Sequence, residues 1–530
     1  MLSIPPTTGA TMSQDAATST TPAEPPTEGK GLATGTLGLV GSTVIGLAST
    51  APVYSLAATL GFVVLAVGAQ APIALILAFI PMFFVAFAYR ELNRAVPDCG
   101  TTFTWATKAF GPRVGWMGGW GVVVAGTIVL ANLAQIGGKY FWLLVNPELA
   151  ENTVVVTATG VVFIAAMTYI SYRGTEIGER VQNVLLGIQY LALLIFVIAV
   201  IVAVATGTAP AGAAAPELSW FNPFAFESAS GFVQAIILAL FIYWGWDTCL
   251  ALNEETKDPE RTPGRAAVLS TVILMVTYVG VTVAAMAFAG LGRAGLGLGN
   301  ETNANDVFFA LKDVLFGPFA WLLVVAVMVS AISSTQTTIL PTARGTLAMA
   351  TYRALPKRFG TVHPKFKTPA YSTTVMGVVA STFYVLMTIV SEDFLSDTIL
   401  SLGLAIAFYY SITGYACVWF FRRELFTSAH NIVFKFLFPL LGALMLSAAF
   451  IFAAIDMINP EYGFTVLFGI GGVFVVGIGS LLVGAVLMVV WSFFDRSKPF
   501  FRGETLNATS EVLVPETVVP TKRSIDGGLA

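Results

Sequence analysis

The chain has 530 residues, of which 56% are hydrophobic and only 11% are charged, and its mean hydropathy is +0.80. Soluble domains usually carry about 25% charged residues. Here the charges are missing from successive stretches of about 20 residues, the length that crosses the hydrocarbon core of a bilayer. The composition excludes a soluble globular protein and predicts an all-α polytopic membrane protein, since a barrel would show short alternating strands. A net charge of −3 gives no reason to expect a nucleic-acid partner.

The first residues are rich in Thr, Ser, Pro and Ala and lack the basic start and apolar core of a signal peptide. We expect disordered cytoplasmic tails at residues 1–36 and 495–530. Between these tails the apolar stretches predict twelve transmembrane helices. Their expected ranges are 38–60, 71–89, 114–145, 153–171, 182–206, 228–255, 266–289, 318–342, 371–390, 395–420, 433–455 and 464–494.

The basic residues set the orientation, because cytoplasmic loops carry an excess of Lys and Arg. With twelve helices and a cytoplasmic N-terminus, all but three of the 27 Lys and Arg residues lie on the inner side. The exceptions are Lys139, Arg293 and Lys312. Both termini are therefore predicted to be cytoplasmic, in a multi-pass protein of the plasma (inner) membrane.

Neither a metal centre nor a disulfide framework is expected. The cysteines Cys99, Cys249 and Cys417 are far apart and form no CxxC pair. The two histidines, His363 and His430, fall in polar loops. Twelve helices without a soluble domain or a reactive cluster favour a transporter over an enzyme, and no cofactor is indicated.

Two of the expected helices contain signals that break a helix. The first, "GLVGSTVIGLASTAPVYSLAATLG", places Ser49 and Thr50 just before Pro52. Proline removes a backbone donor and clashes with the preceding turn. The sixth, "FIYWGWDTCLAL", contains Gly245 and Asp247. Non-helical backbone survives in a membrane only where it lines a cavity, and interruptions in matching helices of two halves indicate a substrate site at the membrane midplane.

The acid in the sixth helix has three candidate roles: a helix cap, a proton carrier and, less favoured, a substrate-binding residue that pairs directly with a substrate amine. Asp247 and Thr248 are good N-caps for a helix that restarts after Gly245. Asp247 is also the ionisable residue expected well inside a span, and such residues are usually functional. We expect Asp247 to cap the restarted helix and to be the first candidate for proton coupling. The exposed N–H groups of a restarted helix also attract anions such as a substrate carboxylate.

Four stretches carry a resemblance to a known family. They are "FIYWGWDTCLALNEETKDPERTPGRA", "PDCGTTFTWATKAFGPRVGWMGGW", "STQTTILPTARGTLAMATYRALPKRFGTVHPKFKTPAYST" and "ERVQNVLLGIQYLALLIFVI". In this order and spacing the sequence resembles the amino acid–polyamine–organocation permeases. The resemblance implies a LeuT-type fold, with five-helix repeats at 37–206 and 228–420 in inverted orientation and two further helices at 433–494.

The resemblance also implies a substrate site at the two breaks. The α-carboxylate of an amino acid would meet backbone N–H groups near Ala48, Ser49, Thr50 and Ala51. The α-amino group would meet carbonyls near Phe241, Ile242 and Tyr243. An aromatic lid would be Trp244 or Phe241, and Gly245 would free backbone groups at the break that follows them.

Ion coupling stays open between H⁺ and Na⁺. Many proton-coupled relatives carry a lysine where this chain is expected to have Gln189, and a neutral amide cannot cycle a proton. Sodium could bind instead, through carbonyls of the first helix with Ser333 or Ser334, because hard cations need several oxygens. Ordinary helix packing explains those two serines equally well. The proton could also pass through Asp247, or the protein could be an exchanger or facilitator.

Several further side chains are candidates for the pathway and its gates. Glu254 and Glu255 could pair with Arg344 or Arg353 as an inner gate, or could form a solvated face. The run Phe408, Tyr409 and Tyr410 could contribute a gate or a pocket wall. The polar residues Thr127, Asn132 and Gln135 of the third helix could face the pathway.

The function expected is transport of amino acids, related amines or polyamines across the plasma membrane. A facilitator or exchanger without ion coupling, or a non-transporting amino-acid sensor on the same fold, is the alternative. The expected partners are a small-molecule substrate and the lipid bilayer. The sequence leaves the particular substrate, the direction of transport and the oligomeric state open.

Overall fold

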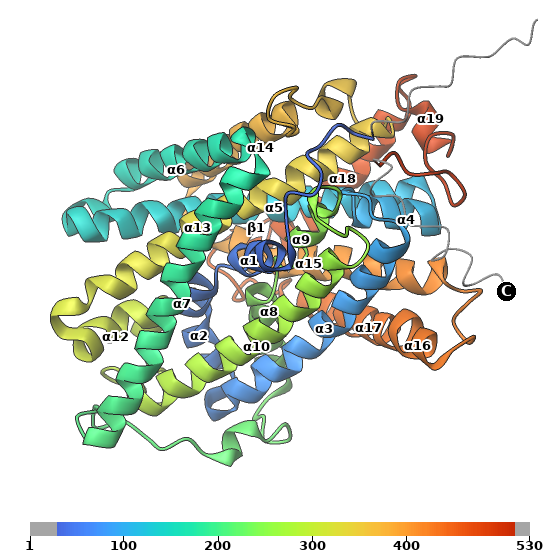
Figure 1. Ribbon diagram of the computed structural model, residues 1–530. Helices are drawn as coiled ribbons and strands as arrows, with labels where there is room; N and C mark the ends of the chain where they lie inside the picture. The colour runs from blue at the N-terminus through green and yellow to red at the C-terminus, as the bar shows by residue number, and fades with distance from the viewer. Residues whose placement is uncertain (1–28, 515–530) are drawn as a thin grey trace, which may run out of the picture.

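A computed structural model describes residues 29–514, apart from the side chains of 392–396 and 399, as a bundle of helices (Figure 1). The first helices are α1 (Leu39–Ser49), α2 (Pro52–Val67), α3 (Ala71–Ala95), α4 (Thr102–Phe110), α5 (Pro112–Val145), α6 (Thr153–Arg173) and α7 (Thr175–Thr206). Next follow α8 (Ala229–Ile242), α9 (Thr248–Ala251), η4 (Asn253–Glu255), α10 (Thr262–Ala289), α11 (Glu301–Ala304), α12 (Val307–Phe316), α13 (Trp321–Thr351), α14 (Ala370–Val390) and α15 (Glu392–Phe420). The last are α16 (Ala429–Asn431), the π-helix η7 (Ile432–Leu437), α17 (Phe438–Asp456), α18 (Gly472–Ser492) and α19 (Lys498–Phe501), with an antiparallel hairpin of β1 (Val466–Leu467) and β2 (Ile470–Gly471).

Ten helical runs within residues 29–514 are long and apolar enough to cross a membrane. The longest, Leu39–Ala95, contains α1, α2 and α3, and the apolar helix α8 is shorter than the others. Each range that the sequence predicted to be helical contains a helix. The chain is therefore an all-α polytopic membrane protein. The clearest boundary difference is at 464–471, where the hairpin replaces the expected start of the last long helix.

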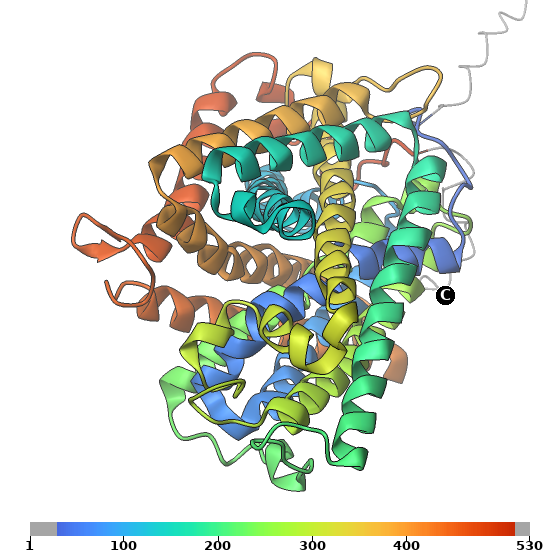
Figure 2. The same cartoon turned by 90° about the vertical axis from the view of Figure 1, so that its left-hand side faces the viewer.

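The helices form a core and a periphery. In α13 and in the Leu400–Phe420 part of α15, 78% of the most apolar window is buried, whereas in α6 and α18 the share is 22%. Helices α6 and α14 lie side by side at the edge of the bundle in both ribbon views (Figures 1 and 2). Because peripheral helices present apolar residues to the surroundings without burying them in protein, they are the elements that face lipid.

Helix ends follow local sequence signals. Prolines stand in the first turn of α2, α5 and α10, where a missing backbone N–H costs nothing. The side chain of Asn152 accepts a hydrogen bond from Val155 at the start of α6, and that of Ser228 accepts one from Gly231 at the start of α8. These caps fix where the two helices begin.

The expectation of disordered tails needs correction at its inner edges. Parts of residues 29–36 and 495–514 are packed, with Lys30, Leu32, Phe500 and Leu506 buried. The physical reason is that distant loops supply their partners, which the composition of the tails does not reveal. The rest of both tails lies outside the described residues.

Candidate functional site

The first break separates α1 from α2. Helix α1 ends at Ser49, and Ala51 adopts a left-handed backbone with φ of 47° before Pro52 opens α2. The Thr50 hydroxyl donates to the Leu47 carbonyl at 2.7 Å, and the Ser55 hydroxyl donates to the Thr50 carbonyl at 2.6 Å. Side-chain hydroxyls thus add hydrogen bonds to backbone carbonyls at the interruption, where the Leu47 carbonyl also accepts from the Thr50 N–H at 3.2 Å.

The second break separates α8 from α9 and lies against the first. Helix α8 ends at Ile242, and Gly245 has φ of 116°. A Cβ added at Gly245 would lie 2.9 Å from both the backbone carbon and the carbonyl oxygen of Ser49. The hydroxyls of Ser49 and Thr248 are 2.8 Å apart. Glycine is therefore required both by the backbone conformation and by the close approach of the two interrupted helices.

Asp247 contacts α15 rather than capping α9. It stands at the N-cap position, but its side chain makes no capping hydrogen bond. Instead the Tyr410 hydroxyl donates to Asp247 Oδ1 at 2.8 Å and the Tyr409 hydroxyl donates to Oδ2 at 3.3 Å. The Trp244 indole N–H donates in turn to the Tyr409 hydroxyl. The prediction of a cap is wrong because two phenols from a distant helix compete for the carboxylate.

The carbonyls expected to receive an amino group are partly occupied. The Tyr278 hydroxyl of α10 donates to the Ile242 carbonyl at 2.8 Å, and the Trp244 N–H donates to the Phe241 carbonyl at 3.1 Å. Among the described residues, the Tyr243 hydroxyl and the Trp246 indole N–H are buried without a hydrogen-bond partner. Buried polar groups are usually satisfied, so these two donors are unsatisfied groups of the second break.

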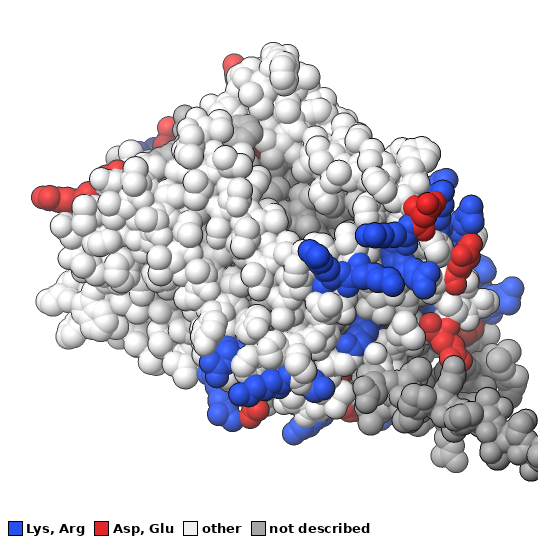
Figure 3. Space-filling model, turned by 90° about the horizontal axis from the view of Figure 1, so that it is seen from above, with Lys and Arg blue, Asp and Glu red and all other residues white. Residues whose placement is uncertain are grey.

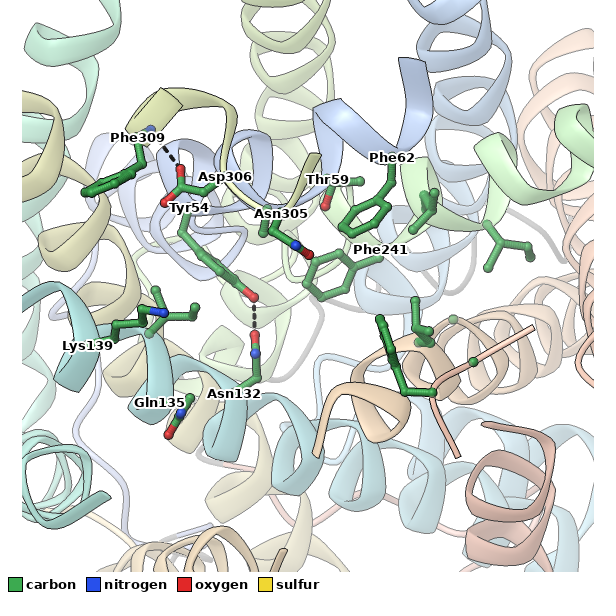
Figure 4. A pocket seen from close by; sticks show the side chains of 18 of the residues that line it. Tyr54, Thr59, Phe62, Asn132, Gln135, Lys139, Phe241, Asn305, Asp306 and Phe309 are labelled. Atoms are coloured by element: carbon green, nitrogen blue, oxygen red, sulfur yellow. Dashed lines mark hydrogen bonds between the residues drawn. The ribbon is translucent and has the colours of Figure 1, made fainter. Parts of the chain in front are cut away.

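A cavity of about 660 Å³ opens above the breaks (Figure 4). Its wall comes from α2, α5, α8, the α11–α12 turn, α15 and the loop after α17. The lining side chains that the close-up labels are Tyr54, Thr59, Phe62, Asn132, Gln135, Lys139, Phe241, Asn305, Asp306 and Phe309.

Of the predicted substrate residues, Phe241 alone lines this cavity. The others, from Ala48 to Ala51 and from Ile242 to Asp247, lie at the breaks outside its wall. Asn132 and Gln135, predicted to face the pathway, do line it, whereas Thr127 is not part of its wall and donates to the Val123 carbonyl of its own helix.

Sequence reasoning missed Tyr54, whose hydroxyl donates to Asn132 Oδ1 across the cavity (Figure 4). It also missed Asp306, which caps α12 at the cavity wall by accepting from the Phe309 N–H at 2.9 Å. An Asp placed just before an apolar run is a cap signal that could have drawn attention to that position.

The predicted ion-coupling residues separate into two places. The Ser334 hydroxyl donates to the Ser49 carbonyl at 2.8 Å, at the end of α1. Ser333 instead exchanges hydrogen bonds with Gln182 of α7, whose amide donates to the Ser333 carbonyl at 3.0 Å. Gln189 donates only to the Leu185 carbonyl of its own helix at 3.3 Å. The residue of α7 that hydrogen-bonds α13 is therefore Gln182, and the placing of Gln189 where relatives carry a lysine stays a prediction.

A profile described as amino acid permease matches residues 35–490 of the chain. The chain belongs to the amino acid permease family. An uncharacterized transporter of Mycobacterium tuberculosis is 30% identical over 65% of this permease and 72% of its own length. The low-affinity putrescine importer PlaP of Escherichia coli is 26% identical over 78% of this permease and 88% of its own length. The branched-chain amino acid permease BcaP of Lactococcus lactis is 26% identical over 74% and 84%, respectively.

On the side of the breaks away from the cavity, the permease contains a buried ion pair. Arg344 Nε of α13 lies 2.5 Å from Glu255 Oε1, and the two side chains are 1% and 0% exposed. The Thr175 hydroxyl donates to the other Glu255 oxygen. Of the pairings predicted for this glutamate, the one with Arg344 is present, and the solvated face expected as its alternative is not. A buried charge pair of this kind fixes how η4, α7 and α13 meet.

Proposed function

We propose that this permease is a secondary transporter that moves an amino acid or a related amine, including polyamines, across the plasma membrane by alternating access. One observation carries the proposal. The two interrupted helices touch at Ser49 and Gly245, beneath a cavity on one side and above the buried Glu255–Arg344 pair on the other. This is the arrangement expected of a transporter whose site at the membrane midplane is reached from one side at a time.

The proposed architecture has twelve membrane passes. Leu39–Ala95 would supply two of them, and α8 with α9 would supply one. An inverted repeat of 37–206 and 228–420, followed by 433–494, makes the interrupted helices equivalent members of the two halves. Lys and Arg gather toward one end of the molecule, which supports cytoplasmic placement of that end and of both termini (Figure 3).

The proposed substrate site uses the backbone around both breaks. A carboxylate group would meet the start of α2, near Ala48 to Ala51, at the positive end of the α2 dipole. The N–H groups of Thr50 and Ala51 donate to the Leu47 and Ala48 carbonyls at 3.2 Å, so a bound carboxylate would replace these carbonyls as their acceptor. An amino group would lie toward Tyr243 and Asp247, beneath Phe241 as the lid. The unpartnered donors of Tyr243 and Trp246 support a polar ligand here. Two relatives are named for putrescine and for branched-chain amino acids, and these names support the substrate class.

Coupling to H⁺ or Na⁺ is proposed for the same region. Asp247, between two phenols, is the proton candidate. The Ser49 carbonyl and the Ser334 hydroxyl are two of the oxygens that a sodium ion would need. Ser333 is less suited to this role because its hydroxyl donates to Gln182. An exchanger without ion coupling and a sensor that binds without moving substrate are the alternatives.

The test is uptake into proteoliposomes that contain the purified permease. Radiolabelled leucine and putrescine are offered under a proton gradient, a sodium gradient or neither, and counterflow is measured with vesicles preloaded with the same substrate. Gradient-driven accumulation identifies the coupling ion, and counterflow alone identifies an exchanger or facilitator. Ligand-induced thermal stabilisation without flux in any arm would overturn transport and favour the sensor.

A further inference from the structure

The segment that precedes α1 carries a lysine into a wholly buried position. The Lys30 ammonium lies 2.7 Å from Asp98 Oδ2 and 2.7 Å from Glu254 Oε1, and all three side chains are 0% exposed. Its third contact is the Leu513 carbonyl at 2.9 Å, from the other end of the chain. One ammonium thus joins the α3–α4 loop, η4 and both terminal segments.

The two carboxylates are held in place independently of Lys30. Asp98 Oδ1 accepts from the Gly100 N–H and the Thr104 hydroxyl, and Oδ2 also accepts from the Tyr352 hydroxyl at 2.7 Å. Glu254 Oε1 also accepts from the Cys99 N–H at 2.9 Å. We call these two acids, Asp98 and Glu254, the acidic socket.

Lysine is the cation that this socket holds. Oxygens of Asp98 and Glu254 and the Cys99 sulfur lie within 4.8 Å of one another, a grouping that could suit a metal ion, but the Lys30 ammonium fills the space between the oxygens. Burial alone would lower the pKa of Lys30, yet the two carboxylates raise it well above its usual value. The lysine therefore stays charged at neutral pH.

Backbone contacts tie the same segment to the inner half of the second interrupted helix. Leu37 forms a parallel bridge with Thr256, the Thr36 N–H donates to the Glu255 carbonyl at 2.8 Å, and the Lys257 N–H donates to the Leu37 carbonyl at 2.7 Å. Helix α1 begins two residues later, at Leu39. Because the segment continues directly into α1, any outward swing of α1 on this side pulls on Lys30.

The C-terminal segment covers the socket. The Leu513 N–H donates to the Tyr352 hydroxyl at 3.0 Å, and the Thr505 hydroxyl donates to the Tyr352 carbonyl at 2.6 Å. The Lys108 ammonium donates to the Ser510 carbonyl at 2.6 Å. The two ends of the described chain therefore meet at this charged cluster.

We propose that Lys30 is an inner-gate residue of this permease, whose ammonium in the Asp98–Glu254 socket, covered by residues 505–514, holds the cytoplasmic side closed. It acts beside the Glu255–Arg344 pair but is contributed by the tail rather than by a membrane helix. The inference rests on the proposed alternating-access function, because a gate must open in each cycle. Breaking one partner of a buried ion pair leaves an uncompensated charge, so loss of Lys30 disfavours the closed state.

The experiment uses Cys99, which is buried in the socket, as a reporter. The full-length permease carries Cys249→Ala and Cys417→Ala, and the rate of Cys99 modification by a membrane-permeant maleimide is measured in proteoliposomes without substrate. Lys30→Met is expected to raise that rate at least about fivefold, the lower end of typical coupling between two conformational states. Lys30→Arg, which keeps the charge, is expected to stay near the parent rate. Lys357→Ala, an exposed lysine of the same side, is the matched control.

A second variant separates gating from folding. Where Lys30→Met is too unstable to purify, Lys30→Met with Glu254→Gln removes one buried unpaired charge while leaving the gate without its cation. Faster Cys99 modification in this double variant supports the gate, and a parent-like rate in the folded variant overturns it. The outcome is independent of transport, because failure of the parent protein to carry any substrate would overturn the proposed function and leave the labelling comparison intact. As a further readout, KM for external substrate should rise more than Vmax falls, which a purely structural contact would not produce.

Discussion

At the scale of single residues, Asp247 is the acid that the second break presents to α15. Its carboxylate accepts hydrogen bonds from Tyr409 and Tyr410, so its protonation would disturb both phenols together. We expect Asp247→Asn, which keeps the shape but cannot titrate, to flatten the pH dependence of uptake between about pH 5.5 and 8. Uptake by the variant and the parent is compared across that range in proteoliposomes. A parent-like pH profile in the variant would exclude a proton role for Asp247.

Asp306 gives a second prediction at this scale. Burial at the cavity wall raises the pKa of Asp306 to about 7, although its hydrogen bond from Phe309 and the charge of Lys139 oppose the shift. As pH rises through about 7 the cavity gains a negative charge, so KM for a cationic substrate should fall. Asp306→Asn, which preserves the helix cap, should remove that pH dependence.

The same shift of the Asp306 pKa fixes the sign of a stability effect. Between the unfolded pKa of about 4 and the folded pKa of about 7, the folded protein holds one more proton than the unfolded chain. The free energy of unfolding contributed by Asp306 therefore falls as pH rises across this window. Melting temperatures of the parent and of Asp306→Asn are measured in detergent from pH 4.5 to 8. The melting temperature of the parent should fall relative to that of Asp306→Asn as pH rises, and parallel curves would contradict the raised pKa of Asp306.

At the scale of helices, a single substitution can disrupt the contact between the two breaks. Gly245→Ala would place a Cβ 2.9 Å from the Ser49 backbone and force an alanine to φ of 116°. We expect uptake to fall at least tenfold and stability to drop by about 1–3 kcal/mol, the usual cost of a strained backbone conformation. Gly280→Ala in α10 is the control, since nothing lies within 4 Å of the added Cβ. Equal uptake by the two variants would mean that the breaks need not touch.

The helices also show what sequence can and cannot predict. Pro52 and Gly245 predicted both breaks correctly because their effect on backbone is local. The partners of Asp247 were missed because Tyr409 and Tyr410 lie about 160 residues away in the sequence. The neighbouring sequence instead suggested a helix cap. Gln182 and Gln189 are seven residues apart, which is close to two helical turns, so both lie on nearly one face of α7. Periodicity therefore could not decide which of the two amides meets α13.

For the whole molecule, the distribution of charge was predictable and the fate of the tails was not. Counting Lys and Arg along the chain predicted that they gather at one end, and the surface shows this (Figure 3). The same count treated Lys30 as an ordinary cytoplasmic charge. Its burial depends on Asp98 and Glu254, which the fold brings together from positions 68 and 224 residues away. Long-range pairing of this kind has no signature in local composition.

Alternating access predicts that the two sides of the molecule are coupled. Opening one side of a transporter must close the other, because both sides report on one conformational equilibrium. Arg344→Ala leaves Glu255 buried without its partner and should disfavour the state closed on that side by about 3–5 kcal/mol. Closure of the opposite cavity should follow.

The measurement places a reporter in that cavity. Gln135→Cys, on the cavity wall, is introduced into a protein whose native cysteines are replaced by alanine, and its modification by an impermeant maleimide is followed. Adding Arg344→Ala should slow the modification at least about fivefold, whereas Arg358→Ala, an exposed arginine, should leave it unchanged. In the double variant Glu255→Gln with Arg344→Ala, the modification rate should lie between those of Arg344→Ala and the parent, because the unpaired buried charge is removed. An unchanged or faster rate in Arg344→Ala would mean that the two sides open independently, as in a channel.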